Sequence, residues 1–506
     1  MGQSFANISL YYQYWSKKKP GDWLSQKTWD DLNMDDFFDC IDYTSSCVGR
    51  QHLYALLHYN RVSEIAGQEK AIRALSADET ARKAIQSDLK KLDAPDAYTI
   101  VSLFSMPHPV CSRRFYKLLR VLQFLPFLFL GLCIVTSSFW FLAPLCIAFF
   151  VNLFLHYRNK AQMQGYFFSI PQLCRLLKQA EKLAENPLCA SVQGNVKDVL
   201  EELRPLRKHL STFRLSIRLD SDWAIIVYSF VEIINMFFLR EVVPVSKAFF
   251  WLRGKQPQIE EVFRFFGLVD VLCSVSELRK ELPYFTLPEP CLEGETFHAE
   301  SLYHPLVADC ISNDITLRGK SVLITGSNMS GKTTFVRAVG LNLLSGQVLN
   351  TCFAHSFRMP VNTSLASAIH LEDSLMEGKS FFLQEVQTVR EMLAKGEAGG
   401  HLLLLDELFK GTNTVERIAI AKAVLSALVK QSNIVFVSTH DIELASLLAA
   451  EYELYHFCES VGNDTLSFDY KLKPGPVTER NAIRILEMCD YPHEVIKEAY
   501  RLAGYQ

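Results

Sequence analysis

The feature that most limits the possible folds is the glycine-rich segment GSNMSGKT at residues 326–333, which fits the pattern GxxxxGK[ST]. The stretch Ser321–Thr325 before it predicts a short buried strand, and apolar residues at helical spacing follow from Thr334 to Leu344. Strand, glycine loop and helix in this order are typical of a phosphate-binding α/β domain. The alternative is a chance glycine-rich turn before a helix.

The chemistry of a phosphate site accounts for the spacing in this loop. Gly326 and Gly331 let the backbone curl, so that its N–H groups and the helix N-terminus can face the phosphates of a nucleotide. Lys332 would reach the β and γ phosphates, and the hydroxyl of Thr333 would hold Mg²⁺. We therefore predict ATP and Mg²⁺ as cofactors. The predicted phosphate-binding residues are Gly326, Ser327, Asn328, Met329, Ser330, Gly331, Lys332, Thr333 and Thr334.

Two later strand ends carry candidate catalytic residues. The apolar run from His401 to Leu405 predicts a buried parallel strand that delivers Asp406 and Glu407 to its C-terminal edge. Asp406 would bind Mg²⁺, and Glu407 would orient or deprotonate the attacking water. His440 follows another predicted strand, residues 434–438, and could hydrogen-bond the γ-phosphate or its water; the alternative is a structural histidine.

Composition indicates a well-packed intracellular protein. A length of 506 residues allows roughly three domains, and a composition of 49% hydrophobic and 21% charged residues is typical of a well-packed protein. The net charge of -3 gives no global basic field, so any nucleic-acid surface must be local. The 13 cysteines form no CxxC pair, which favours reduced thiols in a cytoplasmic setting.

A second constraint is the stretch Val121–Tyr157, which contains no Asp, Glu, Lys or Arg. About 37 residues of helix would extend about 55 Å, nearly twice the roughly 30 Å hydrocarbon core of a bilayer, whereas two crossings of about 18 residues fit. Thr136, Ser137 and Ser138 supply a polar turn near the midpoint. We predict a transmembrane helical hairpin that places residues 121–157 in the lipid bilayer.

Positive charges flank this hairpin on both sides, and a hairpin brings them to one face of the membrane. They are Arg113, Arg114, Lys117, Arg120, Arg158 and Lys160. That face should be cytoplasmic. We therefore expect a multi-pass protein of the inner (cytoplasmic) membrane, with its ATPase domain in the cytoplasm. Two alternatives stay open: a hairpin buried in a large core, and a third crossing at Trp223–Leu239, where Glu232 would be costly.

Helical patterns and proline positions predict four segments. They are an N-terminal helical segment 1–118, the hairpin 119–158, a helical segment 159–288, and an α/β ATPase domain 289–506 with a C-terminal helical tail. Pro283, Pro288 and Pro290 mark the last boundary. The predicted fold class is thus multidomain, mostly α-helical with a transmembrane hairpin, followed by an α/β P-loop domain.

The motifs together resemble the MutS family, whose members are DNA mismatch-repair proteins with an ABC-type dimeric ATPase. Residues 325–334 resemble the phosphate loop of that family, including the pair Asn328-Met329, and residues 373–385 resemble its signature segment. Asp406-Glu407, the loop 411–414 and Thr439-His440 follow in the order of the family. Residues 42–50 and 268–278 resemble the start and end of its helical core, so the helical segments 1–118 and 159–288 would be MutS-like core and lever.

The resemblance implies a head-to-tail homodimer in which Ser380 of one subunit approaches, in trans, the γ-phosphate held by Lys332 and Thr333 of the other. ATP would close the dimer, and hydrolysis through Glu407, with His440 sensing the phosphate, would reopen it. The family grips DNA. Two departures from the family are expected or seen: we expect this protein to lack the mismatch-reading domain, and the sequence has Ile311 where the family often has an aromatic residue that stacks on adenine.

Three functions are compatible with these features. The first is a membrane-associated MutS-like ATPase that binds DNA, the second a MutS-derived membrane switch without DNA contact, and the third an ABC transporter ATPase. The third is weakest because a transporter signature reads LSGGQ, whereas Ser380 lies in a MutS-type segment. Besides the hairpin flanks, the basic residues available for DNA are Arg204, Arg207 and Lys208, and anionic lipid would explain those near the hairpin equally well.

Overall fold

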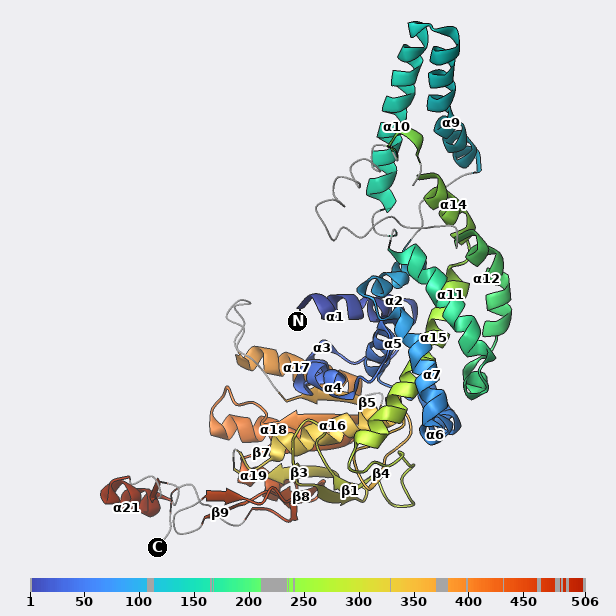
Figure 1. The fold of residues 1–506 in the computed structure, drawn as a ribbon. Helices are drawn as coiled ribbons and strands as arrows, with labels where there is room; N and C mark the ends of the chain where they lie inside the picture. The colour runs from blue at the N-terminus through green and yellow to red at the C-terminus, as the bar shows by residue number, and fades with distance from the viewer. Residues whose placement is uncertain are drawn as a thin grey trace. The chain divides into compact units, whose positions relative to one another are not determined.

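The computed structural model describes residues 2–106, 113–163, 166, 168–210, 234, 236–239, 242–327, 329–369, 381–396, 399–430, 432–461, 466–477, 483, 486–487 and 491–503 (Figure 1). The chain forms two compact units. We call residues 1–19, 43–55 and 70–276 the helical unit, and residues 20–42, 56–69 and 277–506 the sheet unit. The units are discontinuous in sequence.

The sheet unit is built around a six-stranded sheet with the order β11-β8-β3-β7-β6-β5. All pairs of neighbouring strands in this sheet are parallel except the pair β11 and β8. The strands are β3 Ser321–Thr325, β5 Ser364–Ala368, β6 His401–Asp406, β7 Ile434–Thr439, β8 Tyr452–His456 and β11 Lys473–Pro474. The predicted strands before the glycine loop, before Asp406 and before His440 are therefore present.

Helices cover both faces of this sheet, which is why its strands are apolar on both sides. Helix α16, Lys332–Leu349, packs on one face, where a Cβ added at Gly340 would lie 2.6 Å from Leu404. The other face packs against α17 Phe381–Gly396, α18 Thr414–Val429 and α19 Ile442–Leu448 through a cluster that includes Leu403 and Leu405. Leu403 and Leu405 thus face one layer and Leu404 the other, as the alternation of a strand requires.

Smaller elements complete the sheet unit. A second sheet has the antiparallel order β2-β1-β4, and β9 pairs with β10. Their bounds are β1 Phe297–Leu302, β2 Asn313–Leu317, β4 Ser356–Arg358, β9 Glu459–Val461 and β10 Leu466–Phe468. The C-terminal tail contains α21, His493–Leu502.

Two N-terminal segments belong to the sheet unit because they satisfy polar groups of its edge strand β5. The side chain of Asn60 both donates to the carbonyl of Leu365 and accepts from its N–H, each at 2.9 Å. The buried carboxylate of Asp31 accepts from the Ser367 hydroxyl at 2.6 Å and from the Ile369 N–H at 3.0 Å. The segments carry α3 Gln26–Asp31, α4 Met34–Ile41 and the short helix η1 Glu64–Gln68.

The described part of the helical unit consists of helices. They are α1 Gly2–Ile8, α2 Leu10–Lys18, α5 Cys47–Leu57, α6 Glu69–Ala77, α7 Glu79–Leu89, η2 Lys90–Leu92, η3 Pro95–Val101, α8 Ser102–Ser105, α9 Arg113–Thr136, η4 Phe139–Phe141, α10 Leu142–Met163, α11 Ser169–Glu185, η6 Pro187–Val192, α12 Val196–Leu210, α14 Val242–Leu252 and α15 Gln256–Glu281. The buried carboxylate of Asp270 on α15 accepts from the Ser45 N–H at 2.9 Å and from the Ser46 hydroxyl at 2.5 Å, which fixes the start of α5.

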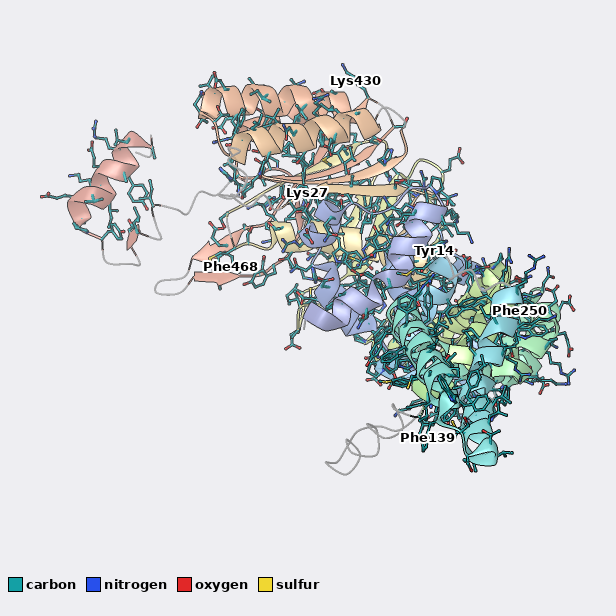
Figure 2. The ribbon with its side chains drawn as sticks, turned by 90° about the horizontal axis from the view of Figure 1, so that it is seen from above. Tyr14, Lys27, Phe139, Phe250, Lys430 and Phe468 are labelled. Atoms are coloured by element: carbon teal, nitrogen blue, oxygen red, sulfur yellow. The ribbon has the colours of Figure 1, made fainter. Side chains whose placement is uncertain are left out.

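Helices α9 and α10 lie side by side as a long hairpin (Figure 1). The turn between them falls at Ser137, with φ of 50°, so the predicted polar turn is present. Two spans in the hairpin, Arg114–Thr136 and Phe139–Arg158, are long and apolar enough to cross a membrane, and only 11% and 17% of their most apolar windows are buried. Phe139, labelled in Figure 2, is 84% exposed. Within the described residues these are therefore not core helices.

One buried amide connects the two arms of the hairpin. Pro126 lies inside α9 and has no N–H, so the carbonyl of Leu122 loses its helical donor. Asn152 on α10, which is fully buried, donates to that carbonyl at 3.2 Å and to the carbonyl of Phe237 at 2.7 Å. The polar side chain in the apolar run thus points inward. Most of Trp223–Leu239 lies outside the described residues, and a third crossing there stays a prediction.

Candidate nucleotide-binding site

The carboxyl ends of three adjacent strands bring the predicted site residues to one edge of the sheet. Thr325 at the end of β3 is in register with Thr439 at the end of β7, and Asp406 at the end of β6 is in register with Ser438. Strand β3 lies between β7 and β8: the chain runs from β3 to β5 at the edge, returns through β6 to β7 beside β3, and then crosses to β8 on the other side of β3. Ligands of parallel α/β sheets bind at such an edge.

The glycine loop, residues 326–333, needs its glycines for backbone reasons. Gly326 has φ of 147° and Gly331 has φ of 105°, both in the region that side chains disfavour. A Cβ at Gly326 would also lie 2.5 Å from the carbonyl oxygen of Phe457. The buried Ser330 hydroxyl donates to the Ser327 carbonyl at 2.8 Å, while Met329 is 81% exposed. The loop is thus a tight turn that leads directly into α16.

Lys332 begins α16 and is buried beneath this loop. Its ammonium donates to the carbonyls of Gly326 and Ser327, each at 2.7 Å. Burial lowers the pKa of Lys332, and the carboxylates of Glu407 and Asp406 partly oppose that shift. Because both hydrogen-bond partners are neutral carbonyls, the positive charge remains available for a phosphate.

Thr333 and Asp406 are already in contact. The Thr333 hydroxyl donates to Asp406 Oδ2 at 2.7 Å, and the Ser438 hydroxyl donates to Oδ1 at 2.5 Å. One hydroxyl and one carboxylate fit Mg²⁺, which takes one or two protein oxygens and completes its shell with phosphate and water. Among the described residues no group of three or more His, Cys, Asp and Glu could form a metal cage. The donor set therefore fits a nucleotide-bound Mg²⁺.

Glu407 follows Asp406 in a left-handed conformation, with φ of 49°, and its N–H donates to the Ser438 carbonyl at 2.9 Å. Its carboxylate is 8% exposed, forms an ion pair with Lys410 and lies 3.6 Å from Nδ1 of His440. Burial raises the pKa of Glu407, but the Lys410 ion pair and the charges of His440 and Lys332 outweigh burial and leave this pKa lowered. An ionised carboxylate can accept a proton from water.

Four of these residues, Lys332, Thr333, Asp406 and Glu407, line a cavity of about 650 Å³, which is large enough for a nucleotide. Thr334 also lines it, whereas His440 is not among its lining residues. The remaining lining includes His304, Val307, Ile311 and Tyr470. The cavity therefore combines polar side chains suited to phosphate with apolar and aromatic side chains.

Two lining residues escaped the sequence analysis. Tyr470 supplies an aromatic ring although Ile311 does not, and Tyr470 stacks on Phe468 with ring centroids 5.8 Å apart. His304 is buried, its Nδ1 accepts the Leu306 N–H at 3.2 Å, and burial lowers its pKa to about 4, so the ring is neutral at pH 7. The sequence signal for His304 was its place in the segment YHPLV at residues 303–307, which resembles the entry to the ATPase domain of the MutS family; Tyr470 had no such signal.

Some predicted site residues cannot be placed. Asn328 and Ser380 lie outside the described residues, as does most of the signature segment 373–385. The described end of that segment begins α17, where the buried carboxylate of Glu385 accepts the N–H of Phe409. In the loop 411–414, Asn413 accepts the Glu416 N–H at 3.0 Å and so caps α18.

The chain is similar to known proteins in this region. Residues 322–504 match the family model described as MutS domain V. The chain is 29% identical over 253 residues to the DNA mismatch repair protein MutS of Thermus thermophilus, covering 49% of this chain and 31% of that protein. It is 27% identical over 256 residues to the DNA mismatch repair protein MutS of Natronomonas pharaonis, covering 49% and 29% of the two chains.

A eukaryotic relative matches in the same way. The DNA mismatch repair protein MSH3 of Yarrowia lipolytica is 31% identical over 198 residues, covering 38% of this chain and 20% of the relative. The matched region thus spans less than a third of the length of each of these curated relatives. The match to MutS domain V, the relatives and the phosphate-type cavity agree, and residues 322–504 form a domain of the MutS domain V type.

Proposed function

We propose that this protein is a membrane-associated ATPase of the MutS type, which binds ATP with Mg²⁺ in the cavity beside the glycine loop and hydrolyses it to ADP and phosphate. The observation that carries this proposal is the convergence of Lys332, the Thr333–Asp406 pair and Glu407 on one cavity of nucleotide size. Lys332 and Thr333 begin α16 after the loop that follows β3, whereas Asp406 and Glu407 come from the end of β6.

The roles of the residues follow from their positions. Lys332 and the N–H groups of the glycine loop bind the phosphates, and the Thr333 hydroxyl and the Asp406 carboxylate hold the metal. Bound Mg²⁺ would neutralise charge that develops on the phosphates. Glu407 orients the attacking water and accepts its proton at a carboxylate oxygen, since its lowered pKa keeps it ionised. His440, 3.6 Å from Glu407, hydrogen-bonds the water or the terminal phosphate.

In this proposal two copies of the chain close on the nucleotide. Ser380 of one subunit approaches, in trans, the phosphate that Lys332 of the other subunit binds. The similarity to the MutS family supports the homodimer. Opening and closing would then follow binding and hydrolysis, and the helices would transmit that motion.

The hairpin α9–α10 is the proposed membrane anchor, with the sheet unit in the cytoplasm. Its outward side chains are apolar: Phe124 is 61%, Ile134 72% and Trp140 87% exposed. Within a bilayer every backbone polar group needs an internal partner, and Asn152 supplies one for the carbonyl that Pro126 frees. In water that carbonyl could be hydrated instead. Two arms of about 20 residues match the hydrocarbon thickness.

The test compares ATP turnover by the purified full chain and by two variants. We expect Glu407→Gln to bind ATP but to lose most turnover, and Lys332→Ala to lose binding. Lys430→Ala is the control, because Lys430 lies exposed at the end of α18 (Figure 2) and does not line the cavity. Normal turnover by both active-site variants would reject this site as the seat of hydrolysis.

We propose DNA as the binding partner of the dimer, since the relatives are named DNA mismatch repair proteins. One observation favours the second candidate, a membrane switch without DNA contact. Of the basic residues available on α12, Arg204 pairs with Glu201 at 3.3 Å and Arg207 pairs with Glu181. A titration against matched, mismatched and branched DNA across salt distinguishes the candidates. A steep salt slope supports DNA, and no binding at low salt supports the membrane switch.

A further inference from the structure

The sequence around the hairpin has an extreme charge bias. Between Asp96 and Glu181 the chain contains no acidic residue. Its basic residues in that interval are Arg113, Arg114, Lys117, Arg120, Arg158, Lys160, Arg175 and Lys178, and none of them falls within 121–157. Positive charge near the hairpin is therefore not neutralised by neighbours in sequence.

On α9 the structure separates an exposed face from a packed face. The packed face carries Phe115, Leu119 and Leu122, which contact Leu239 and Val243. The exposed face is basic at its start and apolar afterwards; its members in chain order are Arg114, Lys117, Leu118, Arg120, Val121, Phe124 and Leu128. Their spacing follows the 3.6-residue repeat, so one face changes from charged to apolar next to Arg120.

On the other arm of the hairpin, α10, the change from charged to apolar side chains lies at the same level. The hydrogen bond from Asn152 to the Leu122 carbonyl fixes the relative level of the antiparallel arms. Arg158 lies as far beyond Asn152 as Tyr116 lies before Leu122, and both arms rise about 1.5 Å per residue. Arg158, which is exposed, is therefore level with Tyr116 on α9. The ring of Tyr116 lies 6.0 Å from the Arg120 guanidinium.

We call Arg114, Lys117, Arg120 and Arg158 the basic collar, and we infer that it binds the anionic headgroups of phospholipids in one leaflet. This inference rests on the proposed membrane anchor. The collar borders the exposed apolar surface of both arms. A bilayer with acidic lipids matches this arrangement, because its apolar core lies directly beside a layer of negative phosphates. DNA offers phosphates without the apolar phase. The free end of the hairpin, with Phe139 and Trp140, carries no charge, so headgroup binding is one-sided.

The experiment uses the full chain, made by cell-free synthesis in the presence of vesicles and separated by flotation at limiting lipid. The vesicles contain phosphatidylcholine alone or phosphatidylcholine with phosphatidylglycerol. The collar variant is Arg114→Gln, Lys117→Gln and Arg120→Gln together. The matched control is Lys70→Gln, Lys90→Gln and Lys197→Gln, which removes the same charge from exposed positions of the helical unit.

Each basic side chain at an anionic surface strengthens partitioning about fivefold at low salt. We expect phosphatidylglycerol to raise the partition coefficient of the wild type and the control at least tenfold, with the increase shrinking at high salt. The collar variant should lose most of this increase but still float with neutral vesicles.

The outcomes separate the two proposals. Equal flotation of the wild type with both vesicles overturns the headgroup site and leaves the anchor intact, whereas no flotation with either vesicle overturns the anchor itself. An unchanged lipid preference in the collar variant also overturns the headgroup site. If the same variant instead loses binding to duplex DNA in a salt titration while its vesicle binding is unchanged, the collar is a nucleic-acid surface.

Discussion

The buried carboxylate of Glu385 accepts a hydrogen bond from the backbone N–H of Phe409, which ties α17 to the turn that carries Glu407. Both Glu407 and Phe409 have positive φ, 49° and 61°, a conformation that costs non-glycine residues about 1 kcal/mol or more each. The turn therefore needs partners that hold it. Glu385 is one, and it connects the end of the predicted signature segment to the proposed general base.

We expect Glu385→Ala to lower stability by about 1–3 kcal/mol, because the Phe409 N–H would lose its buried acceptor. Turnover should fall as well, since the turn that positions Glu407 loosens. Glu385→Gln keeps an acceptor oxygen and should retain more of both. Urea unfolding and ATP turnover measure the effects, with Glu391→Ala at an exposed position of the same helix as control. Equal behaviour of Glu385→Ala and Glu391→Ala would contradict the assignment.

The pH dependence of ATP turnover should change when Lys410 is replaced. The lowered pKa of Glu407 means that its carboxylate stays ionised as the pH falls, and its contribution to stability and turnover is lost only below its ordinary range. Lys410→Ala removes the ion pair but leaves the burial, so the pKa should rise and the acid limb of kcat/KM should move to higher pH. Lys410→Arg keeps the charge and should leave the acid limb in place. A profile that is the same in all three proteins would exclude Lys410 from this role.

Tyr470 should contribute to nucleotide affinity through its ring. Stacking of a base on an aromatic side chain contributes about 1–3 kcal/mol, so Tyr470→Ala should weaken ATP binding roughly 5- to 150-fold while Tyr470→Phe binds nearly normally. Tripolyphosphate lacks a base and should bind wild type and Tyr470→Ala alike. Calorimetric titration with both ligands checks this, and a parallel loss of tripolyphosphate affinity would point to a collapsed cavity instead.

Asn152 and Pro126 should be coupled. Asn152→Leu leaves the Leu122 carbonyl without its donor and should destabilise the hairpin by about 1–2 kcal/mol. Pro126→Ala restores a helical N–H for that carbonyl. The double variant should therefore recover the part of the stability that Asn152→Leu loses because the Leu122 carbonyl has no donor. Thermal unfolding in detergent measures the cycle. Additive losses would mean that Asn152 acts only through the Phe237 carbonyl.

An ion pair between the buried Arg279 and the half-buried Glu69 should stabilise the C-terminal end of α16. Arg279 donates to both carboxylate oxygens of Glu69 at 3.0 Å and to the carbonyl of Asn350, which follows α16, at 2.8 Å. Arg279→Ala should cost about 3–5 kcal/mol because the carboxylate and carbonyl lose their partner. The exposed pair Lys83–Glu79 is the control, and Lys83→Ala should cost less than about 0.5 kcal/mol. Melting temperatures that drop equally would argue against this role of the Arg279–Glu69 pair.

Local patterns in the sequence were enough for the strand, glycine loop and helix at 321–349 and for the hairpin with its turn at Ser137. The reason is that periodicity, glycine conformation and the absence of charge act over a few residues, where one sequence is sufficient evidence. Asp406 and His440 could be expected at one edge because parallel strands end together, and the register of β6 with β7 agrees with that expectation.

Only the tertiary structure decided which distant segments complete the sheet unit and its cavity. Asn60 and Asp31 bind the edge strand β5, Tyr470 reaches the cavity, and Glu385 holds the turn after Glu407. These contacts join residues far apart in the chain through single hydrogen bonds or ring faces, which leave no periodic trace. The sequence by itself determined the elements and their chemistry, whereas packing decided their partners.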